Sequence, residues 1–300
     1  MATQPEQSKT RIGFIGLGHM GSHMVPRLMS AGYPMTLYDR TKEKAQQVAQ
    51  HSASVAETPK DLAASCELVI SCVTNDAALE DVMFGPNGAL AGGHNGSVFI
   101  DMSTVSPGAS RKMYNAAKEK GFPMLDAAMS GSVPQVEQGS LVLFVGGDQH
   151  IYEQCQPILQ VFSKQIFYMG SSGMGTSMKL VVNTLLGLGM QALAEAIALG
   201  QKAGLGKEQL LHVLGQTAVI APNVKGKLEN VKREEYPTNF ALSLMHKDFS
   251  LILNEAYEQS VSMPATAAAQ QMFSAALASG MDEDISAIVK YMEESAGLKR

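Results

Sequence analysis

The run GFIGLGHMG occupies residues 13–21, at the end of an apolar segment and before an amphipathic one. Its glycines form the pattern Gly-x-Gly-x-x-Gly. The first glycine permits a tight turn, the second lets the backbone come close to a pyrophosphate, and the third lets strand and helix pack closely. The helix that follows offers backbone N–H groups to the anion. The run therefore predicts a dinucleotide-binding βαβ unit. The residues expected to bind the dinucleotide in this loop are Gly16, Leu17, Gly18, His19 and Met20.

An acidic residue about twenty positions further on completes the fingerprint of this unit. Asp39 stands at that distance and ends the next apolar run. An aspartate there accepts hydrogen bonds from both ribose hydroxyls and repels a 2′-phosphate, which favours NAD. Arg40 and Thr41 favour NADP instead, because a guanidinium and a hydroxyl suit a 2′-phosphate, and Lys42 and Lys44 add positive charge. These residues leave both coenzymes open.

Short apolar runs alternate with longer amphipathic ones from Arg11 to about Ile166, which indicates strands and helices in turn. The short runs are apolar at successive residues, as strands are when helices cover both faces of a parallel sheet. We therefore predict an α/β fold with a doubly wound parallel sheet. The expected strands lie in the runs RIGFIG, PMTLYD, CELVISCV, GSVFIDMS, FPMLDAAMS and SLVLFVGG.

The pattern changes after Gly170, beyond which apolar residues recur at helical spacing without a cluster of helix breakers. The first of these helices should have about thirty residues, long enough to cross between domains. We predict a loose leader over residues 1–10, a dinucleotide-binding domain over 11–165 and an all-helical domain over 166–300.

The composition argues against two classes of partner. The 300 residues are 45% hydrophobic and carry a net charge of -5, with basic residues dispersed among acidic ones, so no surface for nucleic acid is indicated. The apolar stretch from Leu180 to Leu199 contains Asn183, Gln191 and Glu195, which a lipid-facing helix tolerates poorly. We expect a soluble protein with a small-molecule partner and no nucleic-acid or membrane partner.

The beginning of the chain and its cysteines favour a cytoplasmic protein. The first ten residues, MATQPEQSKT, are polar and lack the apolar core of a signal peptide. Cys66, Cys72 and Cys155 are widely spaced and odd in number, as expected of reduced thiols. The histidines form no metal-ligand pair apart from the spacing of His19 and His23 on the nucleotide loop, so we expect no metal site.

Lys179 and Asn183 are the candidate catalytic pair. They stand four residues apart near the start of the long apolar helix and so share one of its faces. An ammonium there can donate a proton to a carbonyl oxygen, or polarise it, while the amide orients the same oxygen. The spacing alone equally allows a lysine that extends to solvent and an asparagine that binds a neighbouring segment.

Five segments of the chain, within residues 14–249, occur in the order seen in the β-hydroxyacid dehydrogenase family. They read FIGLGHMGSHM, IDMSTVSP, DAAMSGSVPQVEQGSL, GMGTSMKLVVN and LMHKDF. On these segments the chain resembles that family, which includes 3-hydroxyisobutyrate dehydrogenase, tartronate semialdehyde reductase and glyoxylate/succinic semialdehyde reductase. The resemblance implies a Rossmann-type N-terminal domain, an all-α C-terminal domain and a site in the cleft between them.

The resemblance also implies roles for residues of the substrate site. Lys179 corresponds to the family's catalytic lysine and Asn183 to its substrate-binding partner. Ser130 and Gly131 correspond to the segment that binds the substrate carboxylate, where a hydroxyl beside backbone N–H groups suits an anion. Lys247 corresponds to a lysine near both cofactor and substrate.

Two further segments correspond to parts of the family's coenzyme site. Ser103 and Thr104 match the stretch that lies by the nicotinamide ring. Val73, Thr74 and Asn75 match the loop that passes under the ribose.

The carboxylate segment departs from the family pattern D-A-P-V-S-G-G, because Ala128 replaces the proline and Ser132 the last glycine. Loss of proline restores an N–H and frees the φ angle, so we expect the loop to shift. Ser132 and the runs IDMSTV, APNVKGK and SVSMPATAAA resemble the glyoxylate/succinic semialdehyde reductase branch. That branch favours NADPH and usually has asparagine where this chain has Asp39. The resemblance therefore favours NADP(H), with NAD(H) as the alternative.

The resulting expectation is an NAD(P)H-dependent reductase that interconverts glyoxylate or succinic semialdehyde and the hydroxy acid, with Lys179 as general acid and base. The alternative substrates are 3-hydroxyisobutyrate and tartronate semialdehyde, and Phe240 with residues 124–134 would decide between them. Imine reduction is less expected, because imine reductases typically lack a lysine at the position of Lys179. A non-catalytic nucleotide sensor is also less expected, because the chain has both Lys179 and Asn183. The helices after Gly173 carry more Leu, Met and Ala than a small domain needs, which predicts a homodimer or homotetramer.

Overall fold

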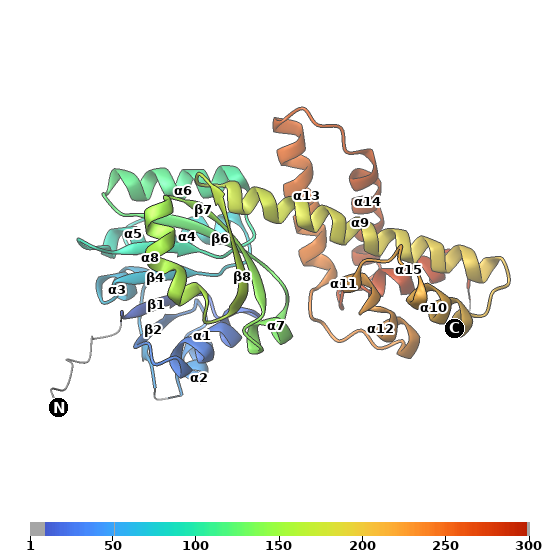
Figure 1. Cartoon of the computed structure of the whole chain (residues 1–300), viewed down its shortest axis with the longest axis horizontal. Coiled ribbons are helices and arrows are strands. Elements are labelled where there is room, and N and C mark those ends of the chain that lie inside the picture. Colours follow the sequence, from blue (N-terminus) through green and yellow to red (C-terminus); the bar gives the residue numbers. More distant parts are fainter. Residues whose placement is uncertain (1–9, 51, 299–300) are drawn as a thin grey trace. The chain divides into compact units, whose positions relative to one another are not determined.

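The computed structural model describes residues 10–50 and 52–298. The predicted leader over residues 1–10 lies outside them except for its last residue. The chain divides into two compact units, Met1–Lys179 and Leu180–Arg300. The first unit contains a sheet with helices, and the second is helical (Figure 1).

One mixed sheet forms the centre of the first unit. Its strands are β1 (Ile12–Ile15), β2 (Met35–Tyr38), β3 (Ser54–Val55), β4 (Leu68–Ser71), β5 (Val98–Asp101), β6 (Met124–Ser130), β7 (Leu141–Gly147) and β8 (Ser163–Gly170). They lie in the order β3-β2-β1-β4-β5-β6-β7-β8. All neighbours are parallel except β6 and β7, which are antiparallel. The predicted Rossmann-type sheet is confirmed, with one antiparallel pair that the apolar runs did not reveal.

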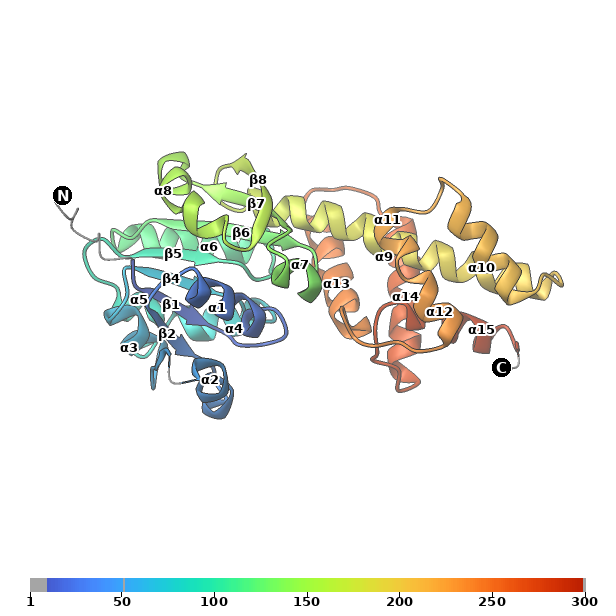
Figure 2. The same cartoon turned by 60° about the horizontal axis from the view of Figure 1, so that its bottom comes forward.

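Helices cover both faces of this sheet (Figure 2). They are α1 (Gly21–Ser30), α2 (Lys42–Ala49), α3 (Pro59–Ala64), α4 (Asp76–Met83), α5 (Ala89–Gly92), α6 (Pro107–Glu119), α7 (Val133–Glu137) and α8 (Gln149–Leu159). Side-chain oxygens of Thr58, Asn75 and Ser106 accept hydrogen bonds from backbone N–H groups at the starts of α3, α4 and α6.

Neighbouring residues of one strand enter two different hydrophobic cores. Phe14 packs in a cluster with Ile70 and residues of α1 and α8. Ile15, the next residue, packs with Val69, Phe99 and residues of α3, α4 and α6 on the other face. This arrangement explains why the strands are apolar at successive positions.

The last strand, β8, lies partly beyond the domain boundary that was predicted at residue 165. It pairs in parallel with β7, so the sheet continues to Gly170. Lys164 and Gln165 are exposed on this edge strand, and its first half therefore lacks the apolar run by which the other strands were recognised. The two compact units divide farther on, between Lys179 and Leu180.

The second unit contains one hydrophobic core among its helices. They are α9 (Met174–Lys202), which begins in the first unit, α10 (Lys207–Gln216), α11 (Pro222–Lys225), α12 (Leu228–Arg233), α13 (Leu242–Glu258), α14 (Pro264–Ala278) and α15 (Ala287–Ser295). Met190 and Ile197 of α9 join this core. Phe249 and Phe273 meet edge to face in it, with ring centroids 5.3 Å apart at 86°. The predicted all-helical domain with a long first helix is confirmed.

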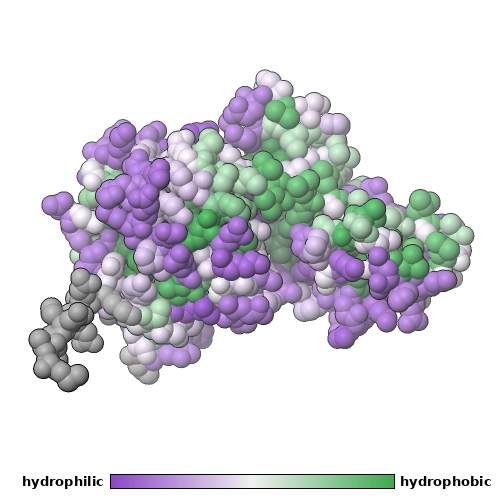
Figure 3. Space-filling view, in the orientation of Figure 1, coloured by the Kyte–Doolittle hydropathy of each residue, from purple (hydrophilic) through white to green (hydrophobic). Residues whose placement is uncertain are grey.

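The helix α9 is apolar on its exposed side as well as on its buried side. Leu185 and Leu199 are 71% and 72% exposed, and hydrophobic residues show on the surface of the helical unit in Figure 3. By length and composition alone α9 could cross a membrane, with 44% of its most apolar window buried. The core helix of a soluble protein passes the same test, so this is weak evidence for a membrane span.

Candidate active site

The glycine loop between β1 and α1 has two glycines that the fold requires and one that it does not. A Cβ on Gly16, whose φ is +96°, would lie 2.3 Å from the carbonyl oxygen of Cys72. A Cβ on Gly21 would lie 2.1 Å from the carbonyl oxygen of Gly16. A Cβ on Gly18 would meet nothing within 4 Å. The space in front of Gly18 fits the close approach of a dinucleotide phosphate.

His19 and Met20 of this loop directly precede α1. His19 is exposed, and its ring centroid lies 6.3 Å from that of His23. The His23 Nδ1 lies 3.0 Å from a carboxylate oxygen of Glu137. Met20 is partly buried against the core. The described residues contain no group of three His, Cys, Asp or Glu side chains that could hold a metal ion.

Asp39 accepts backbone hydrogen bonds from the glycine loop and from the residue that precedes α2. Its Oδ2 accepts a hydrogen bond from the N–H of Leu17 at 2.8 Å, and its Oδ1 accepts one from the N–H of Thr41 at 2.9 Å. Each oxygen keeps acceptor capacity, because a carboxylate oxygen has two lone pairs. Asp39 thus ties the glycine loop to the start of α2.

The cationic residues after Asp39 differ in their surroundings. Arg40 is exposed, and its guanidinium makes no hydrogen bond or ion pair with any described residue. Lys42 is paired with Glu57. Arg40 is therefore better placed than Lys42 to meet an added phosphate.

A buried network joins the ends of β4 and β5. Asp101 Oδ1 accepts hydrogen bonds from the hydroxyls of Ser71 at 2.8 Å and Ser103 at 2.7 Å. The Ser103 hydroxyl oxygen in turn accepts the N–H of Val73 at 2.9 Å. Burial raises the pKa of Asp101 to about 6, although the serine hydrogen bonds oppose that rise. The network holds the two predicted coenzyme loops together, and it uses the Ser103 hydroxyl for that purpose.

The remaining predicted coenzyme residues lie beside this network. Thr74 and Asn75 are exposed, and the Asn75 side chain caps α4 by accepting the N–H of Ala78 at 2.8 Å. Thr104 follows Ser103 and is half-buried. Asp76 accepts hydrogen bonds from both the N–H and the hydroxyl of Ser106, at 3.0 and 2.6 Å. These contacts explain why polar residues cluster at the carboxyl ends of β4 and β5.

The predicted carboxylate segment lies at the end of β6. Ser130 is the last residue of the strand, and Gly131 has a φ of +132°, where a Cβ would lie 2.6 Å from the Leu141 side chain. Ser132 donates its N–H and its hydroxyl to the side-chain oxygen of Gln135, at 2.9 and 2.8 Å, at the start of α7. Ala128 is buried inside β6 opposite Phe144, so the missing proline concerns the strand and not the loop after it.

Asn183 and Asp248 form a buried polar pair in the second unit. The Asn183 Nδ2 donates to Asp248 Oδ2 at 2.5 Å, and each residue is 1% exposed. The Lys247 Nζ lies 3.0 Å from Asp248 Oδ1. The Asn183 Oδ1 is buried and has no hydrogen-bond partner among the described residues. Because Asp248 accepts the amide N–H, the amide oxygen is the atom left open.

Sequence reasoning missed Asp248, although a signal for it exists. The buried residues of α13 are Leu242, Met245, Asp248, Phe249, Ile252 and Ala256. A carboxylate at a position where the helical period calls for an apolar side chain indicates a buried polar contact.

Phe240 precedes α13 and packs partly buried against the helical core. Its N–H donates to Asp284 Oδ2 at 3.2 Å, and its carbonyl oxygen accepts the N–H of Ile285 at 2.8 Å. Asp284 is fully buried, and Lys227 also donates to it at 2.7 Å. The backbone of Phe240 is thus tied to a second loop. His246 lies farther along, where a ring nitrogen contacts the Ser274 hydroxyl at 2.8 Å.

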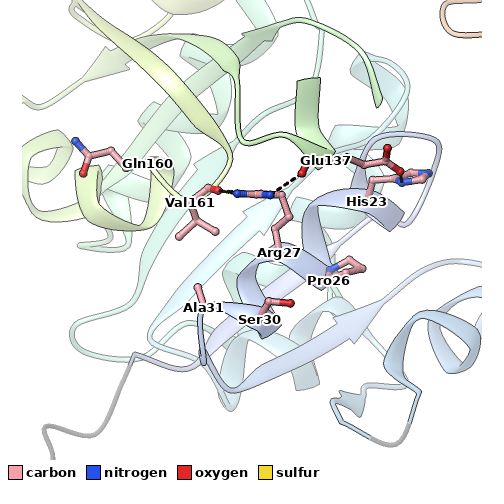
Figure 4. Close-up of a pocket in the computed structure, with 8 residues that line it drawn as sticks. All are labelled: His23, Pro26, Arg27, Ser30, Ala31, Glu137, Gln160 and Val161. Carbon is pink, nitrogen blue, oxygen red and sulfur yellow. Dashed lines mark hydrogen bonds and ion pairs between the residues drawn. The ribbon is translucent and has the colours of Figure 1, made fainter. Parts of the chain in front are cut away.

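A pocket of about 640 Å³ has none of the predicted site residues in its lining (Figure 4). Arg27 of α1 donates from Nε to the carbonyl oxygen of Val161 at 2.9 Å and from Nη1 to that of Glu137 at 2.6 Å. Through these hydrogen bonds the Arg27 guanidinium joins α1 to α7 and to the residues that follow α8. The pocket is lined by His23, Pro26, Arg27, Ser30, Ala31, Glu137, Gln160 and Val161.

The described site residues therefore form two groups. One surrounds the glycine loop and the ends of β4 to β6, and the other centres on Asn183 and Asp248. Lys179 is half-buried on α9, the helix that also carries Asn183 one turn later.

Two protein-family models match the chain. The NAD binding domain of 6-phosphogluconate dehydrogenase matches residues 11–170. The NAD-binding domain of NADP-dependent 3-hydroxyisobutyrate dehydrogenase matches residues 173–292. Together they cover both compact units.

Individual relatives are similar over almost their whole length. 2-(Hydroxymethyl)glutarate dehydrogenase of Eubacterium barkeri is 35% identical, over 97% of this chain and 98% of its own. Glyoxylate/succinic semialdehyde reductase 1 of Arabidopsis thaliana is 35% identical, over 95% of this chain and 99% of its own. The structure of Mycobacterium tuberculosis 3-hydroxyisobutyrate dehydrogenase with L-serine has a TM-score of 0.85 at 26% identity, over 94% of this chain and 98% of its own.

Proposed function

The chain belongs to the NAD(P)-dependent β-hydroxyacid dehydrogenase family, among its 3-hydroxyisobutyrate dehydrogenase-like members, and we propose that it interconverts a small aldehyde acid and its hydroxy acid. Glyoxylate and succinic semialdehyde are the proposed aldehyde acids. The similarity to glyoxylate/succinic semialdehyde reductase 1 supports them. 3-Hydroxyisobutyrate and tartronate semialdehyde are the second choice, and the similarity to 3-hydroxyisobutyrate dehydrogenase supports the former.

One observation carries this proposal. The buried amide oxygen of Asn183 has no hydrogen-bond partner among the described residues, and Lys179 stands one helical turn before it. A buried acceptor without a donor costs about 1–3 kcal/mol, so this atom calls for a donor from a bound water or a ligand. A substrate hydroxyl or the Lys179 ammonium suits this atom.

Lys179 acts as the general acid and base. In reduction its ammonium donates a proton to the carbonyl oxygen, on which negative charge develops, and in oxidation the amine accepts the hydroxyl proton. A bound nicotinamide coenzyme supplies or accepts the hydride. Asp248 accepts the N–H of the Asn183 amide, so the amide oxygen acts as an acceptor and Lys179 serves the reacting oxygen as donor.

The substrate carboxylate binds at the end of β6. The Ser130 hydroxyl and the backbone N–H groups around Gly131 form the proposed cradle, which the positive φ of Gly131 supports by turning the backbone there. Phe240 and Lys247 complete the proposed substrate contacts.

We propose NADP(H) as the preferred coenzyme. The exposed Arg40 guanidinium, which pairs with no described residue, supports a contact with the 2′-phosphate. Both Asp39 oxygens accept backbone N–H groups, so its charge is partly compensated. The proposed coenzyme contacts otherwise come from the glycine loop, residues 73–75, and residues 103–104.

The protein is further proposed to be cytoplasmic and to form homodimers or homotetramers. Cys66, Cys72 and Cys155 are unpaired, which supports a reducing compartment. The exposed Leu185 and Leu199, which lie on one face of α9 at a spacing of two heptads, support self-association.

The test is a panel of aldehyde acids and hydroxy acids assayed with NADPH and NADH, with Lys179→Ala as the variant. We expect turnover of glyoxylate or succinic semialdehyde, faster with NADPH. Removal of a general acid lowers the rate by about 100-fold or more, so Lys179→Ala should lose that turnover and keep its coenzyme affinity. Turnover that survives in Lys179→Ala would overturn the assigned role, and a panel without any turnover would overturn the reaction.

A further inference from the structure

Asp126 is a buried carboxylate that reaches from β6 to the start of α9. Its Oδ1 accepts a hydrogen bond from the N–H of Gly173 at 2.7 Å. Its Oδ2 accepts the N–H of Thr176 at 2.9 Å and lies 3.3 Å from the Thr176 hydroxyl. Asp126 is 2% exposed and Thr176 1%. The carboxylate thus satisfies N–H groups that the start of a helix leaves unpaired, at the positive end of the helix dipole.

Two glycines leave the room that this contact requires. A Cβ on Gly146 would lie 2.6 Å from Asp126 Oδ1. A Cβ on Gly175 would lie 2.8 Å from Asp126 Oδ2 and 2.3 Å from the carbonyl oxygen of Phe144. Side chains at either position would push the carboxylate or the helix away. Gly175 of the segment GMGTSMK therefore serves the docking of α9 onto the sheet.

The residues that flank this contact are those of the proposed reaction. Lys179 follows Thr176 by three residues, which is about 4.5 Å along the helix axis. Ser130 follows Asp126 by four residues on the same strand, and so lies on the same face of β6. One carboxylate therefore joins the helix that carries the proton donor to the strand that ends in the proposed carboxylate cradle.

We propose that Asp126 is the positioning residue for Lys179, because it clamps the first turn of α9 to β6 and so sets the place of the ammonium relative to Ser130. This role rests on the proposed function. In this role Asp126 itself contacts neither the substrate nor the coenzyme. Catalysis depends steeply on such placement, since a displacement of about 1 Å can lower a rate by about 100-fold.

The test is the variant Asp126→Asn, which preserves the shape of the side chain. Its amide has one acceptor oxygen, so a nitrogen with two hydrogens must face one of the donors that the carboxylate accepts. We expect kcat to fall by about tenfold to 100-fold, with the dissociation constant of NADPH within about twofold of the parent value. Hydrogen–deuterium exchange should become faster over residues 173–182 and not elsewhere on the sheet.

Asp101→Asn is the matched control. Asp101 stands opposite Asp126 on the neighbouring strand, is equally buried, and accepts hydrogen bonds from Ser71 and Ser103 and not from α9. We expect this variant to weaken NADPH binding and to leave exchange over residues 173–182 unchanged. If both variants gave the same pattern, the effect would belong to any lost buried carboxylate, and the proposal would be overturned.

Thr176→Val serves if Asp126→Asn does not fold. It removes only the hydroxyl contact, so we expect a smaller fall in kcat with the same selective increase in exchange. Unchanged exchange in Asp126→Asn would overturn the clamp, and faster exchange with unchanged kcat in either variant would show that the clamp does not position Lys179. If the parent enzyme reduces no aldehyde acid, the proposed function fails, whereas exchange still decides whether the clamp exists.

Discussion

Asp101, Asp126 and Asp284 show what a carboxylate needs in order to be buried. Each accepts several hydrogen bonds, as a buried charge requires: Asp101 from the hydroxyls of Ser71 and Ser103, Asp126 from N–H groups at the start of α9, and Asp284 from Lys227 and the backbone of Phe240. Their titration differs with the charge nearby. Burial opposes ionisation of all three, but the Lys227 ammonium lowers the pKa of Asp284, whereas burial raises the pKa of Asp101 and of Asp126.

The pKa of Asp101 leads to a prediction about stability. The folded value of about 6 lies above the ordinary 3.8, so the folded state holds this proton more tightly than the unfolded state. The protonated Asp101 side chain therefore contributes about 3 kcal/mol to the free energy of unfolding below about pH 4, and this contribution is lost as the pH rises to about 6. Urea denaturation between pH 4 and 7 should therefore show a smaller fall in the free energy of unfolding for Asp101→Asn than for the parent. Equal slopes would contradict the raised pKa.

At the scale of elements, the turn between β2 and α2 carries Asp39 and Arg40, the residues that we propose select the coenzyme. Asp39 holds this turn to the glycine loop, and Arg40 projects from it without a partner among the described residues. The backbone contacts of Asp39 do not involve the Arg40 side chain. Coenzyme choice can therefore change at Arg40 without disturbing the turn.

Arg40→Ala should raise the KM for NADPH by about tenfold or more and leave that for NADH within about twofold, because a charge-assisted hydrogen bond contributes about 1.5–3 kcal/mol. Steady-state kinetics with both coenzymes measures this. Lys42→Ala is the control, since Lys42 is already paired with Glu57. A preference for NADPH that persists in Arg40→Ala would show that Arg40 does not read the phosphate.

At the scale of the whole molecule, the exposed apolar face of α9 predicts self-association. We expect the parent chain to sediment as a dimer or tetramer at micromolar concentration. Leu185→Glu should shift it toward monomer, because a buried unpaired charge opposes the contact. Val219→Glu adds the same charge at an exposed residue outside α9 and should not shift the equilibrium. A monomeric parent chain would contradict the expectation.

Much of the fold was predictable because its signals are local. The glycine run and the apolar strands identify the doubly wound sheet, and the helical period identifies the second unit. The edge strand β8 was not recognised, since Lys164 and Gln165 are exposed in its first half and break the apolar pattern. The antiparallel β6–β7 pair was also missed, because strand direction depends on a connection and not on the strand residues.

The candidate residues that lie in sequence motifs could be named from the sequence, whereas the buried carboxylates that bond to the loops and helices around them could not. Motif spacing identified Lys179, Asn183 and the glycine loop as candidates. Asp101, Asp126 and Asp248 were missed because each has a hydrogen-bond partner 30 to 65 residues away in the sequence. Nothing in the local pattern says which distant N–H or amide a carboxylate will meet.

The open space at Gly18 distinguishes this glycine, which the fold does not require, from Gly16 and Gly21, which it does. Gly16 and Gly21 are surrounded by atoms, so the folded state itself excludes a side chain there. Gly18 has no such neighbour and no positive φ, so an alanine would fit the empty loop and restrict the unfolded chain. Such a replacement usually stabilises a protein by about 0.4–1 kcal/mol. The glycine at position 18 is therefore less stabilising than an alanine would be, as expected of a residue that is kept for ligand binding and not for folding.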